Sequence, residues 1–265
     1  MTPEQLLQHY DGALLWSPGQ IAQMGSDVAQ AYQAALAVRQ MRLARGEQAR
    51  GFKIGFTNRS IWQRYAVFGP IWGTVWNTTL THSDGDAQIS LAHTCQARLE
   101  PEVVFGMKAS PSVGASLEAL FDCIDWVAPG FEIVQSHAPG WKFNAAMTIA
   151  DGGLHAHLAI GQKIPVAAMA DSAQALNAVL ASCCVDLFQN GQLVESGQGS
   201  NVLDSPLLAL HHFLRELQQC PGAPALQTGD VVTTGTWTDA WPVQPGETWQ
   251  AKFDAPLPAL QIVFS

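Results

Sequence analysis

The sequence predicts an α+β fold in which helices come first and strands follow. Apolar residues recur at three- and four-residue spacing within residues 2–47, a pattern typical of helices. From residue 51 on, alternating apolar runs bounded by glycine and proline indicate strands, with two or three helices among them. This order favours α+β over a doubly wound βαβ sheet. Because no linker is evident, we expect a helical N-terminal arm at residues 1–50 and one domain at residues 51–265, packed as one unit.

The N-terminal arm is predicted to contain two helices. Residues 2–5 form a capping-box pattern with a proline at the first helical position. The apolar stripe of this first helix includes Leu14 and Leu15 and ends near residues 17–19. A second, longer helix is predicted over residues 27–45, and the glycine that follows it is suited to end it.

The rest of the chain gives strand, turn and helix signals in turn. An Asn-Gly pair at residues 190–191 lies between two apolar runs and predicts a β-hairpin over residues 182–197. Further strands are predicted at residues 52–56, 97–107 and 130–136, helices at residues 59–65, 117–126 and 206–219, a loop with a short strand at residues 67–80, and β-structure within residues 228–264.

The composition is that of a folded chain with few charges. Its 265 residues include 13 Lys plus Arg and 22 Asp plus Glu, a formal net charge of −9, and charged residues make up 13%. This share is about half of the roughly 25% common in soluble domains. Hydrophobic residues make up 48%, which excludes a disordered chain, and the acidic balance argues against nucleic-acid binding. A charge inside an apolar segment therefore needs a specific reason.

The sequence shows no sign of membrane insertion or export. No apolar run approaches the ~20 residues that span a bilayer, and residues 1–5 lack the features of a signal peptide. The five cysteines are an odd number without a C-x-x-C pair, so they fit neither a disulfide framework nor a thiolate zinc site. We expect a cytoplasmic protein that does not bind membranes.

Three carboxylates lie inside apolar strand segments. Glu100 and Glu102 are two residues apart, so on a strand their side chains share a face, and Glu132 lies in a second strand segment. Like charges held this close repel each other unless a counter-ion neutralises them, and divalent cations such as Mg²⁺ prefer oxygen ligands. Three such carboxylates could hold one ion and leave positions for water and substrate. The alternative is a solvated strand face, and Pro101 weakens the assignment of a central strand.

Lys53 is the lone charge in the predicted strand at residues 52–56. It is either an edge-strand lysine that points to water or a cation that binds an anionic substrate and stabilises an enolate. The aromatic candidates for an apolar substrate pocket, each with core packing as its alternative, are Trp62, Trp72, Trp76 and Trp141, of which Trp72 is the best candidate.

Several segments together resemble the fumarylacetoacetate hydrolase superfamily, and within it the branch of 2-keto-4-pentenoate hydratases and 4-oxalocrotonate decarboxylases. They are Gly51–Thr57, the R-x-E-x-E pattern of Arg98–Glu102, Glu132–Ser136, Thr148–Asp151, Asn190-Gly191, Gly197–Leu207, Gly229-Asp230, Thr234-Gly235 and Pro245–Glu247. The similarity follows nearly the whole chain in order. It implies a mixed β-roll or sandwich with flanking helices, and assembly as a homo-oligomer.

The resemblance also implies a site. Mg²⁺ or Mn²⁺ would be held by Glu100, Glu102 and Glu132, with Lys53 and Glu100 in catalytic roles. The substrate would be a short 2-oxo or 2-hydroxydienoic acid that chelates the metal through its carboxylate and 2-oxygen. The residues expected to contact this substrate are Ile71, Trp72, Ser136, Asp151 and Thr236.

The reaction type depends on where the chain departs from the family pattern. Family hydratases carry an aspartate in a Pro-Asp-aromatic-Gly segment, whereas this chain has Ile71, which cannot transfer a proton. The family decarboxylases are more similar here, and decarboxylation needs an electron sink more than a base. We therefore predict a metal-dependent decarboxylase, with a hydratase as the alternative. Further alternatives are a C–C bond hydrolase of acylpyruvates and a non-catalytic family member.

Two other departures concern histidines. His137 stands where the family has an arginine, which would change the preferred substrate tail. His155 and His157 follow the altered Ala-Asp-Gly segment at residues 150–152. They could restore acid/base capacity, or they are ordinary strand or loop histidines.

Overall fold

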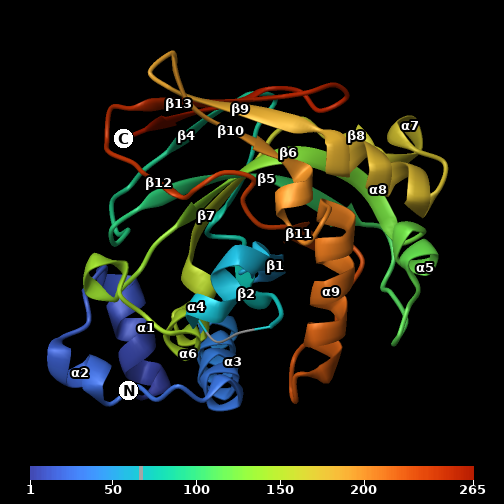
Figure 1. The fold of residues 1–265 in the computed structure, drawn as a ribbon. Helices are drawn as coiled ribbons and strands as arrows, with labels where there is room; N and C mark the ends of the chain where they lie inside the picture. The colour runs from blue at the N-terminus through green and yellow to red at the C-terminus, as the bar shows by residue number, and fades with distance from the viewer. Residues whose placement is uncertain (66–67) are drawn as a thin grey trace.

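Two mixed β-sheets form the centre of the molecule and stack face to face (Figure 1). The computed structural model describes residues 1–65 and 68–265. Within them, the larger sheet has the order β2-β1-β11-β5-β6-β7-β3, with β12 beside β5 and β8 beside β6. Its strands are β1 (Ala49–Gly55), β2 (Ile71–Trp76), β3 (Leu80–His82), β5 (Arg98–Met107), β6 (Ile124–Val134), β7 (His155–Ile160), β8 (Ile164–Pro165), β11 (Val231–Thr233) and β12 (Trp241–Pro242).

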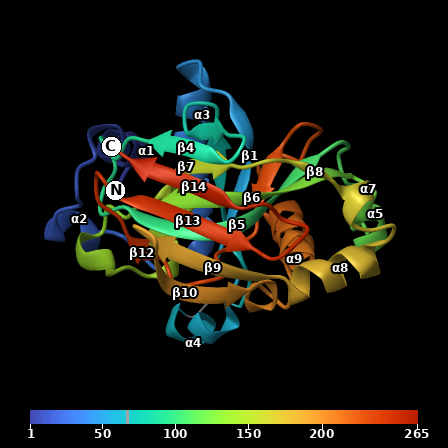
Figure 2. The same cartoon turned by 90° about the horizontal axis from the view of Figure 1, so that it is seen from above.

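The smaller sheet lies across one face of the larger one, as the view from above shows (Figure 2). Its order is β10-β9-β13-β14-β4. Its strands are β4 (Asp86–Ile89), β9 (Cys184–Gln189), β10 (Gln192–Gln198), β13 (Thr248–Phe253) and β14 (Leu260–Phe264). Parallel pairs such as β1 with β11 occur beside antiparallel ones, so the predicted mixed β-roll with flanking helices is confirmed.

Helices flank the sheets on two sides (Figure 1). They are α1 (Pro3–Gly12), α2 (Pro18–Ala22), α3 (Val28–Ala44), α4 (Trp62–Tyr65), α5 (Leu117–Phe121), α6 (Ala145–Ala150), α7 (Val166–Met169), α8 (Ala173–Ser182) and α9 (Pro206–Gln219). Helix α9 packs on β1, where the rings of Phe213 and Phe52 lie 5.2 Å apart between centroids. Among the described residues, no helix has the length and apolarity to cross a membrane.

The N-terminal helices pack onto the rest of the chain through one hydrophobic cluster. Leu6 and Trp16 are buried there against Ala146 and Ile149 of α6. The predicted capping box at the start of α1 is present. Strand β1 begins at Ala49, so the helical segment precedes the sheet and packs against the rest of the chain. The N–H of Trp72 in β2 donates to the Tyr32 hydroxyl of α3 at 3.2 Å.

The first helix is shorter than predicted. It ends at Gly12, because the next residue adopts a left-handed conformation. Leu14 and Leu15 consequently lie outside the helix, with 51% and 46% of their surface exposed. Ser17 then caps α2 with a capping box of its own, so the turn residues that were expected to end one helix also start another.

The later elements agree with the predictions in part. The hairpin β9–β10 is confirmed, with φ of 50° at Asn190 and 83° at Gly191, and so is α9. The predicted helix at residues 117–126 is wrong beyond α5, because Ile124 begins β6, which pairs with β5 along its length. Helices α6 and α8 and strand β7 were not predicted. In the predicted loop at residues 67–80, residue 67 lies outside the described residues, and β2 occupies residues 71–76.

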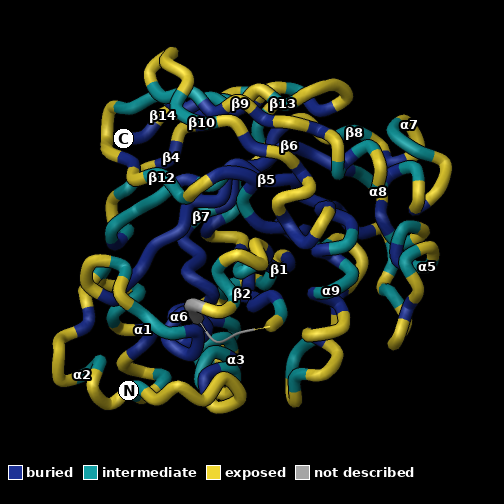
Figure 3. Tube along the Cα trace, viewed as in Figure 1, coloured by how far each residue is buried: buried dark blue, intermediate teal, exposed yellow. Residues whose placement is uncertain are grey.

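Strand β5 is central despite Pro101. Strand β12 pairs with β5 at residues 98–99 and β11 pairs with it at residues 104–106, so Pro101 lies between the two pairings. The Pro101 carbonyl accepts a hydrogen bond from the Trp237 N–H at 3.1 Å. The N–H that proline lacks would point to this same side, where no strand pairs. Proline is therefore tolerated inside a strand that is buried over most of its length (Figure 3).

Candidate active site

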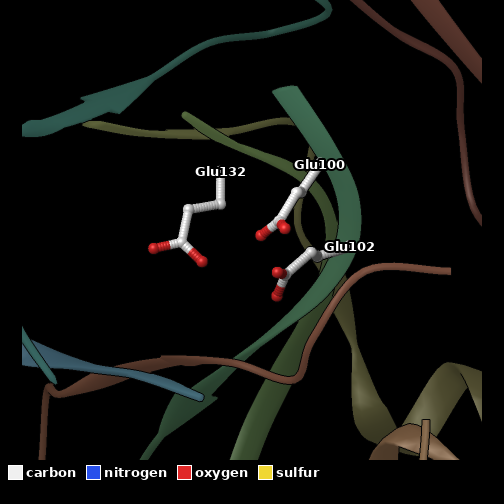
Figure 4. Close-up of side chains that lie close together, drawn as sticks. All are labelled: Glu100, Glu102 and Glu132. Atoms are coloured by element: carbon white, nitrogen blue, oxygen red, sulfur yellow. The ribbon is translucent and has the colours of Figure 1, made fainter. Parts of the chain in front are cut away.

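Three carboxylates from β5 and β6 meet in one place. Glu100 lies directly opposite Glu132 in the strand register, and Glu102 follows on the same face of β5. One oxygen from each carboxylate lies within 4.8 Å of the others, and Figure 4 shows the three side chains gathered together. Glu102 and Glu132 are fully buried, whereas Glu100 borders a cavity. The predicted cluster of acids is therefore a real feature of the fold.

Glu102 has one oxygen fixed by the protein and one that is available. Its Oε2 accepts hydrogen bonds from the backbone N–H groups of Thr234 at 2.9 Å and Gly235 at 2.7 Å. Gly235 has φ +96°, and a Cβ there would lie 1.9 Å from Thr57 Oγ1, so only glycine fits. The buried Oε1 has no hydrogen-bond partner among the described residues. An unsatisfied buried carboxylate oxygen of this kind suits a metal ligand.

Lys53 and Glu132 form a buried ion pair. Lys53 Nζ lies 3.0 Å from Glu132 Oε2, and the two side chains are 3% and 0% exposed. Gly153, with φ +72°, packs against the lysine stem so closely that a Cβ would lie 3.0 Å from Lys53 Cδ. The other Glu132 oxygen, Oε1, lies 3.0 Å from His155 Nδ1. Lys53 thus points at the carboxylates and not at water. This position favours a cation of the site over an edge-strand lysine that points to water.

The charges at this site are not balanced by the protein alone. Burial raises the pKa of Glu100 to about 7 and that of Glu102 well above its ordinary value. Burial alone would lower the pKa of Lys53, but the three nearby carboxylates outweigh it and raise this pKa. Three ionised carboxylates and one ammonium leave two negative charges. An oxygen-ligated divalent cation would neutralise both, so the residues present fit such an ion.

A cavity of about 350 Å³ opens from the carboxylates. Lys53, Glu100 and Ile71 line its inner end. We call the remaining part of the lining that is half-buried or exposed the outer end, and it includes Arg98, Trp141, Phe143, Glu195, Thr236 and Asp239. There the Arg98 guanidinium stacks on the Trp141 ring, 4.4 Å from its centroid. The role of Arg98 was not predicted, although its place in the R-x-E-x-E pattern offered a signal.

The cavity brings together four of the predicted site residues, Lys53, Glu100, Ile71 and Thr236, but not Trp72. Successive residues of a strand face opposite sides, so Ile71 borders the cavity while Trp72 faces the core. Its ring stacks on Tyr32, 4.8 Å away between centroids. Trp72 therefore does not line this cavity, and its contact with a substrate there is not supported by its position. Of the four tryptophans considered, only Trp141 borders this cavity.

Ser136 and Asp151 lie behind the cavity and do not border it. Asp151 accepts hydrogen bonds from His137 Nδ1 at 2.5 Å and from the His137 backbone N–H at 3.0 Å. Ser136 Oγ accepts from the N–H of Ala138 at 3.2 Å. Both side chains shape the turn after β6. His137 bonds to Asp151 and is buried, so it does not replace an arginine at the substrate.

His137 carries a strongly shifted pKa. Burial favours the neutral ring, but the charge of Asp151 and the hydrogen bond to it outweigh burial and raise the pKa of His137 to about 10. The Trp16 N–H donates to the His137 carbonyl at 2.8 Å. This buried pair therefore joins the N-terminal helices to the turn after β6.

The two histidines of β7 do not reach the cavity. His155 is buried beside Glu132, and His157 borders a separate cavity that Tyr10, His93 and Gln135 also line. Neither side chain is placed to exchange a proton with a molecule in the main cavity. Of the two interpretations of these histidines, their positions favour ordinary strand residues over groups that restore acid/base capacity.

Comparison with known proteins identifies the class to which this fold and site belong. The family model described as fumarylacetoacetate (FAA) hydrolase C-terminal matches residues 65–261. The chain belongs to this family, and the resemblance seen in its sequence motifs is confirmed.

Individual relatives narrow the class to one branch. The 2-hydroxyhexa-2,4-dienoate hydratase of Comamonas testosteroni is 30% identical over 222 residues, which cover 83% of this chain and 80% of the relative. The 4-oxalocrotonate decarboxylase of a Pseudomonas species is 28% identical over 207 residues, or 77% of this chain and 75% of the relative. The chain is thus a member of the hydratase and decarboxylase branch.

A solved structure agrees over nearly the whole chain. The structure of 4-oxalocrotonate decarboxylase from Pseudomonas putida G7, complexed with magnesium and adipate, superimposes with a TM-score of 0.88 at 23% identity. The match covers 99% of this chain and 95% of the other. The N-terminal helices are therefore part of the shared fold.

Proposed function

We propose that the chain is a divalent-metal-dependent lyase that decarboxylates a short 2-oxo acid. The observation that carries this proposal is the inner end of the cavity, where three carboxylates and Lys53 converge beside Ile71. Its relatives are named as hydratases and decarboxylases of such acids. The partner is then a small molecule, and the homo-oligomer expected from the resemblance stays a prediction.

Each charged residue at the inner end has a defined part in this proposal. Glu100, Glu102 and Glu132 would hold the ion, Mg²⁺ or Mn²⁺, with Mg²⁺ favoured because the decarboxylase of similar fold is complexed with magnesium. The bound ion supplies Lewis-acid polarisation of the 2-oxo acid. Lys53 stabilises the negative charge that reaches the 2-oxygen when the electron pair of the breaking C–CO₂ bond moves through the conjugated chain. Burial strengthens this stabilisation, since little water competes.

The residues around Ile71 favour decarboxylation over hydration. Adding water needs an acid or base beside the substrate, and Ile71 offers none. The other cavity carboxylates lie at the outer end, where Glu195 already accepts hydrogen bonds from the Asp239 N–H at 3.1 Å and from Trp241 Nε1 at 2.6 Å. Hydration remains the second candidate, because the relative at 30% identity is a hydratase.

Removal of two carboxylates tests the metal site. The double variant Glu100→Gln with Glu102→Gln should lose both Mg²⁺ binding and turnover. Glu118→Gln, on the exposed face of α5, makes the same chemical change away from the site and should behave as wild type. Full activity of the double variant in EDTA would contradict the proposal.

A substrate panel separates the candidate reactions. Short 2-oxo-enoic acids are incubated with the protein and Mg²⁺ while CO₂ release and dienol absorbance are followed together. CO₂ release identifies a decarboxylase, whereas loss of dienol without CO₂ identifies a hydratase. Titration with oxalate, an enolate mimic, covers the non-catalytic alternative: an enzyme binds oxalate only when Mg²⁺ is present, and metal-independent binding or none supports a binding protein.

A further inference from the structure

A histidine that the proposed reaction does not use lies directly behind the carboxylate site. His155 begins β7 and is 3% exposed. Its Nδ1 lies 3.0 Å from Glu132 Oε1, and its Nε2 lies 2.8 Å from Thr79 Oγ1. Both ring nitrogens are thus engaged, one by a proposed metal ligand and the other by a hydroxyl from the turn before β3.

The two partners determine which ring nitrogen carries the proton. An ionised carboxylate only accepts hydrogen bonds, so Nδ1 donates to Glu132. A neutral imidazole carries one proton, which is on Nδ1 when this nitrogen donates to Glu132. Nε2 is then an acceptor, and the Thr79 hydroxyl donates to it at 2.8 Å in preference to the Trp76 carbonyl, which is 3.3 Å away. The Thr79 oxygen in turn accepts the Trp76 backbone N–H at 3.2 Å, so the chain of donors runs from β2 to Glu132.

We infer that His155 is a positioning residue that holds Glu132 in the orientation of a metal ligand, an inference that rests on the proposed metal site. His155 fixes Oε1 of this carboxylate, while Oε2 faces Lys53 at 3.0 Å. Glu102 is arranged in the same way, with Oε2 fixed by backbone N–H groups and Oε1 available. Partners behind a metal ligand typically contribute about 10–100-fold in metal affinity.

Binding of Mn²⁺ to the metal-free protein tests this role without any turnover. The free Mn²⁺ signal in electron paramagnetic resonance gives the dissociation constant. His155→Leu should weaken binding by about 10–100-fold. His155→Asn should retain most of the affinity, because its amide nitrogen takes the place of Nδ1. His155→Gln should resemble the leucine variant, because its amide nitrogen reaches toward Thr79 instead.

A residue that only fills space would give a different order. Leucine and glutamine are closer to histidine in volume than asparagine is, so they would then be the better replacements. That order, or equal affinities for all variants, would overturn the inference. The control is His157→Leu, on the same strand but outside this network, which should bind Mn²⁺ as wild type does. Circular dichroism and thermal melting of the metal-free proteins establish which variants fold. If His155→Leu does not fold, Thr79→Val takes its place in the test, with a smaller expected loss of Mn²⁺ affinity.

The tautomer of His155 provides a second test that needs no metal. Long-range ¹⁵N–¹H nuclear magnetic resonance of the metal-free protein should show a protonated Nδ1 and an unprotonated Nε2, and the opposite tautomer would overturn the inference.

The proposed function and the positioning role of His155 are contradicted by different results. A wild-type protein that binds no Mn²⁺ contradicts the proposed function, whereas wild-type affinity in His155→Leu contradicts the positioning role alone.

Discussion

The two ends of the substrate cavity are built from different kinds of structure. At the inner end, Glu102 and Glu132 project from central strands, and each has one carboxylate oxygen fixed by a protein donor. At the outer end, Trp141 lies in a short turn, and residues 236–240 belong to the loop between β11 and β12, whose first two residues hold Glu102 at the inner end. Strands thus provide most of the inner end, where we propose that negative charge collects on the 2-oxygen, while loops shape the end that meets the rest of the substrate.

This difference implies that the inner and outer ends have different functions. A strand side chain in a buried sheet has few alternative positions, which suits a group that must meet developing charge in one geometry. A loop can change its side chains and path without unfolding the sheet. We therefore expect changes at the inner end to alter turnover, and changes at the outer end to alter substrate preference.

The largest effect is expected from Lys53→Met, which removes the inner cation. It should lower kcat by about 10²–10³-fold, as loss of a donor to a developing oxyanion does. Metal binding should persist, because the change removes a positive charge from beside the three ligands. Steady-state kinetics and Mn²⁺ titration measure the two effects, and Lys108→Met on the exposed surface is the control. An unchanged kcat would place the chemistry elsewhere.

A smaller effect, on stability, is expected from the buried pair of His137 and Asp151 behind the inner end. The pKa of His137 is raised to about 10 in the folded chain, from about 6.5 when unfolded. Its stabilisation is therefore complete below about pH 6.5 and is lost as pH rises toward the folded pKa. In that interval the contribution falls by about 1.4 kcal/mol per pH unit.

Urea unfolding of two proteins at several pH values checks this expectation. The reference variant is His137→Gln with Asp151→Asn, which removes both charges and keeps similar shapes. The difference in unfolding free energy between wild type and variant should shrink between pH 7 and about pH 10. A difference that is constant with pH would mean that the pair carries no net charge coupling.

The smallest effect is expected at the outer end, from Arg98→Met. We expect Arg98 to bind a second carboxylate of the substrate. Because Arg98 is only half-buried, this interaction should contribute about 1 kcal/mol, or roughly 5-fold in KM. KM should rise for 2-oxo acids with a second carboxylate. The inhibition constant of 2-oxo acids with only one carboxylate, which this reaction does not decarboxylate, should stay the same. Arg50→Met, an exposed arginine elsewhere, is the control. An equal rise of the two constants would show that Arg98 does not discriminate between acids with one and with two carboxylates.

The inner end of the cavity could be predicted from the sequence, and the reason is local geometry. Alternation along a strand places Glu100 and Glu102 on one face in any fold that keeps the strand. Glu132 and Lys53 needed the family resemblance, because strand pairing brings them together across the sequence. Trp72 was misplaced because alternation also applies to it: once Ile71 faces the cavity, its neighbour cannot.

Contacts between distant segments were beyond the reach of sequence patterns. His155 and Thr79 are 76 residues apart, and their hydrogen bond depends on β3 pairing with β7. The pairing of His137 with Asp151 likewise depends on how α6 follows the turn after β6. The helix predicted at residues 117–126 failed for a related reason, since pairing with β5 outweighs the local preference of its second half.

Pro101 has a consequence for the opening of the cavity itself. It lies where β11 and β12 separate along the edge of β5, and the loop that lines the cavity passes through this gap. An ordinary residue would offer a backbone donor there, and the ladder could continue from one short strand to the next. Because proline has no backbone N–H, one hydrogen bond of such a continuous ladder cannot form. We therefore expect the absent N–H of Pro101 to keep this opening to the carboxylates from closing, as much as any side chain that surrounds it.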